Sequence, residues 1–315
     1  MQSRPFAEYE LSRLMLGTVQ FGLPYGVANR AGQPGYAEVL AILAAALEGG
    51  VNCFDTAAAY GNSEVVLGRA LQELGVAGQV VVVTKVKALT PEEVESRPLA
   101  VKAIEQSVED SRRRLGLDCL PVVLFHRESD ARYLEVLEDL KARGWLRHAG
   151  VSCDNRPGPA VDYARSGHAA ALQIPANVLD YRHQASGVFR EAAASGVAVF
   201  VRSVYLQGLL VMPEDDIPPA LRDVIPVRRR LAAIASGAGL GLAELALRVM
   251  LSREGITCLL TGVDTVGQIR ENIALFNRGP LPADMIAAVD AAVPVLPEVI
   301  LTPSLWPPPA VMGKR

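Results

Sequence analysis

Short runs of apolar residues alternate with longer stretches of mixed polarity along most of the chain. The short runs are rich in valine, isoleucine and leucine, which is typical of strands buried on both faces of a parallel sheet. The longer stretches carry apolar residues at helical spacing. The pattern therefore predicts repeated strand–helix units, with eight strands at residues 13–19, 51–55, 80–85, 119–126, 146–152, 170–174, 197–203 and 256–262.

Glycines and capping residues predict where several helices begin and end. Residues 36–50 are expected to form a helix that stops at its two final glycines, and the next helix is expected to start at a Ser63 cap and to close at Gly75. Residues 226–255 predict two short helices separated by glycines. The last fifteen residues are rich in proline, so we expect an extended tail that lies over the body of the protein.

Eight strand–helix units are the number that closes a (β/α)8 TIM barrel. An open doubly wound sheet is the alternative, and it usually carries a glycine-rich dinucleotide fingerprint directly after a strand. The nearest match, GAGLG at residues 237–241, follows a helical pattern and has the wrong spacing, and no Walker-type phosphate loop is present. We therefore expect one α/β barrel domain over residues 1–315, with loops and the C-terminal tail over its active-site face.

Composition narrows the class of function. The 315 residues carry a net charge of -3, so there is no basic excess that would favour nucleic acid. The four cysteines, at positions 53, 119, 153 and 258, lie far apart and suggest neither a zinc site nor a disulfide framework. No signal peptide or membrane-spanning stretch is indicated. We expect a cytoplasmic protein that acts on a small molecule, without a metal, nucleic acid or membrane partner.

Three of the predicted strands end on a residue that can take part in proton chemistry. Asp55 ends the second strand, Lys85 the third and His126 the fourth. Each residue alone has a structural explanation, as a turn cap, a snorkelling lysine or a hydrogen-bonded core histidine. In a (β/α)8 barrel, however, the carboxyl-terminal strand ends converge on the active-site face. The three side chains are therefore expected to meet at one rim.

Tyr60, five residues after Asp55, completes a chemically coherent group. A phenol has an unperturbed pKa near 10, and a nearby ammonium group favours its ionised form. Asp55 would hold Lys85 charged and in place beside Tyr60. His126 would then hydrogen-bond a substrate carbonyl oxygen while Tyr60 protonates it. This arrangement suits the reduction of a carbonyl group.

The chain resembles the aldo-keto reductase family in a series of motifs that occur in order between residues 13 and 275: LGTVQFG, FDTAAAYGNSEVVLGRAL, VVTKV, LFHRE, RHAGVSC, LQIPANVLD and TGVDTVGQIRENI. Residues 276–315 would form the last helix and the tail. The resemblance implies a (β/α)8 barrel that binds an extended nicotinamide dinucleotide and reduces aldehydes or ketones without a metal. By position, Tyr60 is the general acid, Lys85 and Asp55 tune it, and His126 orients the carbonyl.

The resemblance also implies a set of cofactor-binding positions: Gly17, Thr18, Asp55, Ser152, Cys153, Gln173, Arg202, Ser203, Leu206, Gly208, Gly262, Val263, Asp264, Gln268, Glu271 and Asn272. Two of these depart from the usual pattern. Cys153 stands where the family generally has asparagine. Arg202 stands where an aromatic ring usually stacks on the nicotinamide, and a planar guanidinium can stack in a similar way.

The cofactor preference is open in the sequence. Most members of the family prefer NADP(H), and they supply a lysine or arginine to its 2'-phosphate. Here the matching loop carries Gly262 and Gln268, and Asp264 adds a carboxylate that suits the ribose hydroxyl of NAD(H) instead. Because most members of the family prefer NADP(H), we expect the protein to favour NADP(H) slightly, with NAD(H) as the alternative. We expect it to discriminate only weakly between the two cofactors.

Two other functions remain alternatives to carbonyl reduction. One is a non-catalytic regulatory relative that keeps the barrel and the dinucleotide, although none of the four proton-chemistry residues is lost. The other is a barrel lyase that uses Lys85 as a Schiff-base amine. For the reductase, the substrate is expected to be a small aldehyde, ketone or sugar-like compound. Three residues are expected to contact that substrate: Tyr25, Arg127 and Trp306.

Overall fold

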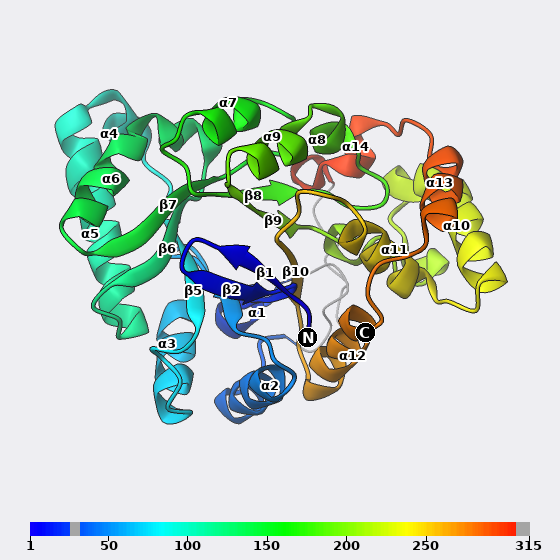
Figure 1. Cartoon of the computed structure of the whole chain (residues 1–315), viewed down its shortest axis with the longest axis horizontal. Coiled ribbons are helices and arrows are strands. Elements are labelled where there is room, and N and C mark those ends of the chain that lie inside the picture. The colour runs from blue at the N-terminus through cyan, green and yellow to red at the C-terminus, as the bar shows by residue number, and fades with distance from the viewer. Residues whose placement is uncertain (26–31, 307–315) are drawn as a thin grey trace.

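The computed structural model describes residues 1–25 and 32–306. Its centre is a closed barrel of eight parallel strands in the order β10-β3-β4-β5-β6-β7-β8-β9 (Figure 1). The eight predicted strands are therefore confirmed, and they span β3 Leu14–Gly17, β4 Cys53–Asp55, β5 Val81–Val86, β6 Leu120–Phe125, β7 Leu146–Ser152, β8 Ala171–Pro175, β9 Ala198–Arg202 and β10 Cys258–Gly262.

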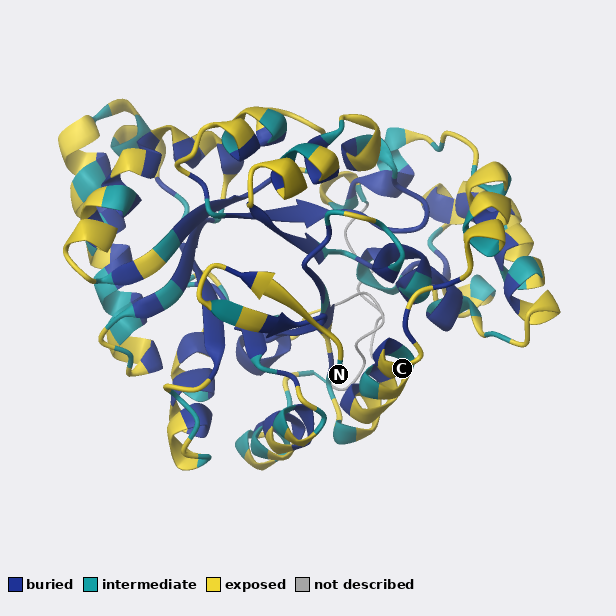
Figure 2. Ribbon diagram, viewed as in Figure 1, coloured by how far each residue is buried: buried dark blue, intermediate teal, exposed yellow. Residues whose placement is uncertain are grey.

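Helices surround this barrel and present buried faces inward and exposed faces outward (Figure 2). The helices before β7 are α1 Val19–Gly22, α2 Tyr36–Glu48, α3 Ser63–Glu73, α4 Pro91–Glu95, α5 Arg97–Leu115 and α6 Leu134–Ala142. Those after β7 are α7 Ala160–Arg165, α8 Arg182–Ala185, α9 Val188–Ala194, α10 Ile225–Gly237, α11 Leu242–Leu251, α12 Val266–Asn277, α13 Ala283–Ala292 and α14 Glu298–Leu301.

The predicted helix ends are mostly confirmed. Gly50 and Gly75 lie just beyond α2 and α3 with φ of +82° and +70°, the left-handed backbone that glycine adopts without strain. The prediction of a Ser63 cap is wrong. Ser63 is the first residue of α3, Asn62 precedes it without a side-chain cap, and the Ser63 hydroxyl donates to the carbonyl oxygen of Thr18 at 2.7 Å. Ser63 therefore joins α3 to the end of β3.

An antiparallel hairpin that the sequence did not predict precedes the barrel. It consists of β1 Ser3–Phe6 and β2 Tyr9–Ser12 (Figure 1). Phe6 and Leu11 of the hairpin pack in one apolar cluster with residues from the starts of several barrel strands, including Cys53 and Cys258. The hairpin thus closes the amino-terminal end of the barrel, and a functional site is expected at the carboxyl-terminal end.

Two further apolar clusters divide the remaining core. The larger cluster lies between the barrel and the helices that surround it. The other is built from α10, α11, α13 and α14 together with the loop that follows β9. Among the described residues no single helix is long and apolar enough to cross a membrane. The segments Pro219–Gly237 and Leu242–Leu251 meet a length and composition test only as a pair bent by 87°.

The prediction of an extended proline-rich tail needs correction for its described part. Pro303–Leu305 forms one turn of 3-10 helix, since proline is tolerated at the first position of a helical turn. Trp306 donates its indole N–H to the carbonyl oxygen of Ile300 at 3.3 Å and packs against the cluster formed by α10, α11, α13 and α14. The rest of the predicted tail, residues 307–315, lies outside the described residues.

Candidate active site

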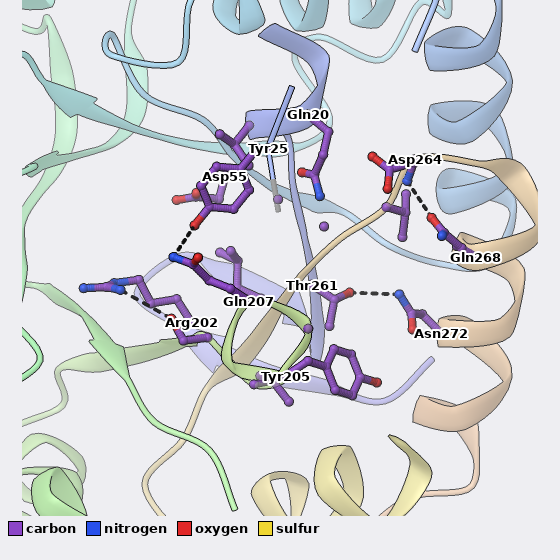
Figure 3. Close-up of a pocket in the computed structure, with 18 of the residues that line it drawn as sticks. Gln20, Tyr25, Asp55, Arg202, Tyr205, Gln207, Thr261, Asp264, Gln268 and Asn272 are labelled. Carbon is purple, nitrogen blue, oxygen red and sulfur yellow. Dashed lines mark hydrogen bonds between the residues drawn. The ribbon is translucent and has the colours of Figure 1, made fainter. Parts of the chain in front are cut away.

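A cleft of about 680 Å³ opens at the carboxyl-terminal ends of the barrel strands (Figure 3). Its walls come from the ends of β3, β4, β8, β9 and β10 and from the loops and helix that follow them. Sixteen of the predicted site residues line it, namely Gly17, Tyr25, Asp55, Tyr60, His126, Ser152, Gln173, Arg202, Ser203, Gly208, Gly262, Val263, Asp264, Gln268, Glu271 and Asn272. The fold thus brings distant parts of the sequence to a single cleft.

Asp55 and Lys85 form a buried ion pair at the base of the cleft. The Lys85 Nζ lies 2.6 Å from Asp55 Oδ1 and donates a second hydrogen bond to the carbonyl oxygen of Thr56 at 2.8 Å. Gln173 from β8 donates to the same Asp55 oxygen at 2.7 Å. Both charged side chains are almost fully buried. A carboxylate at the end of a buried strand is therefore stabilised by a cation and an amide.

The charge state of Lys85 follows from two opposing effects. Burial alone would lower the pKa of Lys85, because a low-dielectric interior disfavours an ammonium ion. The Asp55 carboxylate and the Tyr60 phenol act in the opposite direction and outweigh burial, so the pKa of Lys85 is raised. Lys85 therefore carries a positive charge at neutral pH, beside the phenol that the sequence analysis identified as the acid.

Tyr60 and His126 form the part of the site that faces the cleft. Their rings meet edge to face with centroids 5.6 Å apart, and the Lys85 Nζ lies 5.0 Å from the centre of the Tyr60 ring. Burial and the positive charges of Lys85, Arg202 and Arg127 lower the pKa of His126 to about 3. The imidazole is therefore neutral at physiological pH, and it can donate one hydrogen bond without adding a charge.

Several predicted site residues do not line the cleft. Thr18 is buried behind it, where its hydroxyl donates to the carbonyl oxygen of Asp55 at 2.8 Å. Cys153 and Leu206 are buried in apolar clusters, and burial raises the pKa of the Cys153 thiol well above its usual value. These residues shape the walls from behind.

Two of the three predicted substrate contacts also lie outside the cleft. Arg127 is exposed and acts on His126 only through its charge, and Trp306 packs against the α10–α14 cluster. Tyr25 does line the cleft, and its hydroxyl accepts a hydrogen bond from Gln207 at 3.4 Å (Figure 3). Tyr25 is thus the residue of the three that the geometry supports as a substrate contact.

The loop after β9 has an unusual backbone. Positive φ angles occur at Ser203 (+65°), Leu206 (+48°) and Gln207 (+52°), and residues other than glycine rarely adopt such values. Gly208 follows with a φ of +96°. Arg202, at the start of this loop, donates to the carbonyl oxygen of Cys153 at 3.1 Å. The backbone N–H groups of Leu206 and Gly208 donate to the carbonyl oxygens of Ser203 and Tyr205 at 2.8 and 2.9 Å, so hydrogen bonds within the loop hold this uncommon backbone in place.

The far end of the cleft lies at the start of α12. Thr265 and Gln268 form a capping box, in which the Gln268 side chain accepts from the backbone N–H groups of Asp264 and Thr265. Burial raises the pKa of Asp264. Asp264 and Glu271 are the charged side chains among the cleft residues at this end, so the lining described here is acidic.

The cleft also has lining residues that the sequence analysis did not identify: Val19, Gln20, Val204, Tyr205, Gln207, Val211, Ala243, Leu260, Thr261 and Leu275. A signal was available for Val19, Leu260 and Thr261, because they lie at the carboxyl-terminal ends of predicted strands. The others belong to loops and helices whose direction the sequence pattern does not specify.

The cleft residues fit an extended dinucleotide. Ser152 and Gln173 present hydroxyl and amide groups near the proton-chemistry residues, and the loop after β9 offers its backbone along one wall. A Cβ at Gly17 would lie 3.1 Å from the Leu260 side chain, so the glycine allows β3 and β10 to pack closely in this wall of the cleft. In the described part of the chain no three histidine, cysteine, aspartate or glutamate side chains could hold a metal ion together.

A barrel that brings a phenol, an ion-paired lysine and a neutral histidine to one end of a long cleft belongs to the oxidoreductases. The sequence profile of the Aldo/keto reductase family matches residues 13–294, and the chain therefore belongs to this family, which uses a nicotinamide cofactor. The family resemblance seen in the sequence is confirmed.

Three individual proteins that are similar to this chain share between 22% and 28% of aligned residues with it. The NADH-specific methylglyoxal reductase of Escherichia coli (strain K12) is 28% identical over 269 residues, which cover 75% of this chain and 81% of that protein. The holo form of aldo-keto reductase AKR11C1 from Bacillus halodurans has a TM-score of 0.76 at 23% identity, with 94% and 97% of the two chains covered. The glycerol dehydrogenase AKR11B4 from Gluconobacter oxydans has a TM-score of 0.74 at 22% identity, with 92% and 94% covered. At 22–23% sequence identity, the similarity to these two structures is evidence for the fold alone.

Proposed function

We propose that this protein reduces a small aldehyde or ketone to the alcohol, with a hydride from a nicotinamide cofactor and a proton from Tyr60. The observation that carries the proposal is the buried Asp55–Lys85 pair beside the Tyr60 ring. A protonated lysine held at this place puts positive charge beside the Tyr60 ring, where negative charge develops as the hydroxyl gives up its proton.

Each residue has a distinct part in the proposed reaction. The bound cofactor supplies the hydride to the carbonyl carbon. The electron pair of the C=O bond moves to the oxygen, which takes the proton from the Tyr60 hydroxyl and leaves a phenolate that solvent reprotonates. Neutral His126 donates a hydrogen bond to the same oxygen and orients it. Asp55 and Gln173 keep Lys85 in place throughout.

The Lys85 environment argues against the Schiff-base alternative. A Schiff base requires an uncharged amine that can reach the substrate carbonyl. Lys85 is almost fully buried, is paired with Asp55, and has a raised pKa. The retention of Tyr60, Lys85 and His126 in one site supports an active enzyme over a regulatory relative.

The cleft supports the use of NAD(H) at least as well as NADP(H). Asp264 and Glu271 would repel the 2'-phosphate of NADP, whereas a carboxylate can accept a hydrogen bond from the ribose 2'-hydroxyl of NAD. The Escherichia coli relative is named as NADH-specific, which agrees with this choice. We therefore place NAD(H) ahead of the family's more common NADP(H) for this chain.

Replacing Tyr60 with phenylalanine tests the proposed function. Tyr60→Phe removes the proton donor and should lower kcat at least about a hundredfold, while NADH binding, measured by fluorescence titration, stays close to normal. The substrate screen uses small aldehydes, ketones and sugars and follows NADH absorbance. A variant that keeps more than about a tenth of kcat would show that Tyr60 is not the acid.

A further inference from the structure

Gln20 lines the cleft, and its side-chain oxygen makes no hydrogen bond to the other residues that the structure describes. It lies on α1, three residues after Gly17 at the end of β3, and its side chain points into the cleft (Figure 3). The residue is 8% exposed, so its amide is removed from bulk water. A buried amide requires hydrogen-bond partners to offset the loss of hydration.

The Gln20 amide lacks such a partner among the described residues. Its Oε1 is buried and accepts no hydrogen bond. The amide lies against Gly262 of β10, where a Cβ would approach Nε2 to 2.4 Å and Oε1 to 2.5 Å. Any side chain other than glycine at position 262 would therefore displace the Gln20 amide. The absence of a Cβ at Gly262 gives the amide its place in the wall.

The position of Gln20 indicates which part of a dinucleotide it meets. Gly17 pairs with Asp55 on one side and with Gly262 on the other, so the wall near Gln20 joins the proton-chemistry end to the Asp264 end. In a nicotinamide dinucleotide the nicotinamide ribose and then the pyrophosphate lie between the two ends of the molecule, so a cofactor that spans these ends would have both groups between them. The wall segment beside Gln20 would therefore face the middle of a bound cofactor.

The hydrogen-bonding groups of the Gln20 carboxamide indicate whether it binds the nicotinamide ribose or the pyrophosphate. An unpartnered carbonyl oxygen needs a donor, and pyrophosphate oxygens are acceptors only. A ribose hydroxyl both donates and accepts, so it can satisfy Oε1 and also receive a hydrogen bond from Nε2. We propose that Gln20 binds the hydroxyl groups of the cofactor's nicotinamide ribose and thereby positions the ring over the substrate. This proposal rests on the proposed function, since it requires that the cleft holds a nicotinamide dinucleotide.

Binding measurements with cofactor fragments test the role of Gln20. The variant Gln20→Met keeps the length of the side chain and removes the amide. Its Kd should rise about tenfold for NADH and for ADP-ribose, because each ligand carries the ribose that lies beyond the pyrophosphate. ADP ends at the pyrophosphate, so its Kd should stay within about twofold of the wild-type value. Quenching of intrinsic tryptophan and tyrosine fluorescence reports all three.

Controls separate failure of this proposal from failure of the proposed function. Gln106→Met replaces an exposed glutamine on α5 and should change no Kd. The melting temperature of ligand-free Gln20→Met should equal or exceed that of the wild type, because a buried polar group without a partner is removed. If wild-type protein binds neither NADH nor NADPH, the proposed function is wrong. If it binds NADH and Gln20→Met binds NADH and ADP-ribose equally well, or loses ADP to the same extent, the assignment of Gln20 to this ribose is wrong.

Discussion

At the scale of single residues, the chemistry of the site depends on which groups carry charge. Lys85 keeps its charge despite burial, because Asp55 lies 2.6 Å away. His126 loses its charge, because burial and three nearby cations oppose protonation. The site therefore holds one ammonium ion, beside the Tyr60 ring, and one neutral imidazole that faces the cleft, and the two groups have different expected responses to pH.

The lowered pKa of His126 predicts how stability changes in acid. Unfolded histidine titrates near pH 6.5 and folded His126 near 3, so between these values the unfolded chain binds the extra proton. Stability from neutral His126 is complete above pH 6.5 and is lost as the pH falls toward 3. His126→Asn should therefore lose less melting temperature than the wild type between pH 7 and about 4. Equal losses, measured by thermal denaturation followed by circular dichroism, would contradict the neutral state of His126.

Asp264 carries the prediction on cofactor choice. Replacing this carboxylate with a guanidinium offers the 2'-phosphate of NADP a charge-assisted hydrogen bond. Asp264→Arg should therefore move the ratio of kcat/KM for NADPH over NADH upward by at least about tenfold. The control Glu254→Arg makes the same change of charge at an exposed residue that does not line the cleft. An equal change in both variants would indicate a general charge effect and remove Asp264 from the ribose site.

Individual residues also mark the limit of the sequence analysis. Asp55, Lys85 and His126 could be placed at one rim because each ends a predicted strand. Gln20 could not be identified, because its place in the cleft wall depends on contact with Gly262, which is far away in the sequence. Cys153 follows the end of β7 but turns its thiol into the core, and sequence position alone does not determine that direction.

At the scale of elements, the pattern of apolar residues predicts the barrel strands well and does not predict the β1–β2 hairpin. Strands buried on both faces appear as uninterrupted apolar runs, which is why β5 and β6 could be bounded within about two residues. β1 exposes all its residues except Phe6 and includes Pro5, while β2 combines exposed and buried residues, so the pattern of the hairpin is mixed. Only tertiary contact with the barrel explains why the hairpin forms.

Close packing between α3 and the end of α5 predicts a difference between two glycines. A Cβ at Gly68 would lie 2.6 Å from the carbonyl oxygen of Leu115, whereas a Cβ at Gly237 of α10 would meet nothing within 4 Å. Gly68→Ala should destabilise the protein by about 1–3 kcal/mol through overpacking. Gly237→Ala should stabilise it by up to about 1 kcal/mol, because alanine favours the helix. Denaturant unfolding measures both, and a neutral Gly68→Ala would mean that α3 and α5 can move apart.

At the scale of the whole molecule, the barrel separates stability from chemistry along its axis. The hairpin and the strand starts close one end, while the cleft occupies the other. Loops after the strands carry the specificity of such barrels, and their conformations depend on many weak contacts. That is why the barrel and its rim residues could be predicted from sequence, and the residues that contact substrate could not.

This separation predicts the effect of a substitution in the hairpin. Phe6 is 4% exposed and meets the Phe200 ring edge to face at 6.0 Å. Phe6→Ala should lower the free energy of unfolding by about 3–5 kcal/mol and leave KM for substrate and cofactor unchanged. Arg4→Ala, at an exposed position on the same strand, should change neither quantity. A large change in KM for Phe6→Ala would show that the two ends of the barrel are coupled.

The position of the hairpin also decides how this protein could be attached to a solid support. Its first strand begins at Ser3, at the closed end of the barrel, so an N-terminal tether would hold the molecule with the mouth of the cleft turned toward the liquid. Dissolved cofactor and carbonyl compound could then diffuse to every immobilised copy without passing the support. A flow reactor loaded in this orientation should retain the specific activity of the free enzyme.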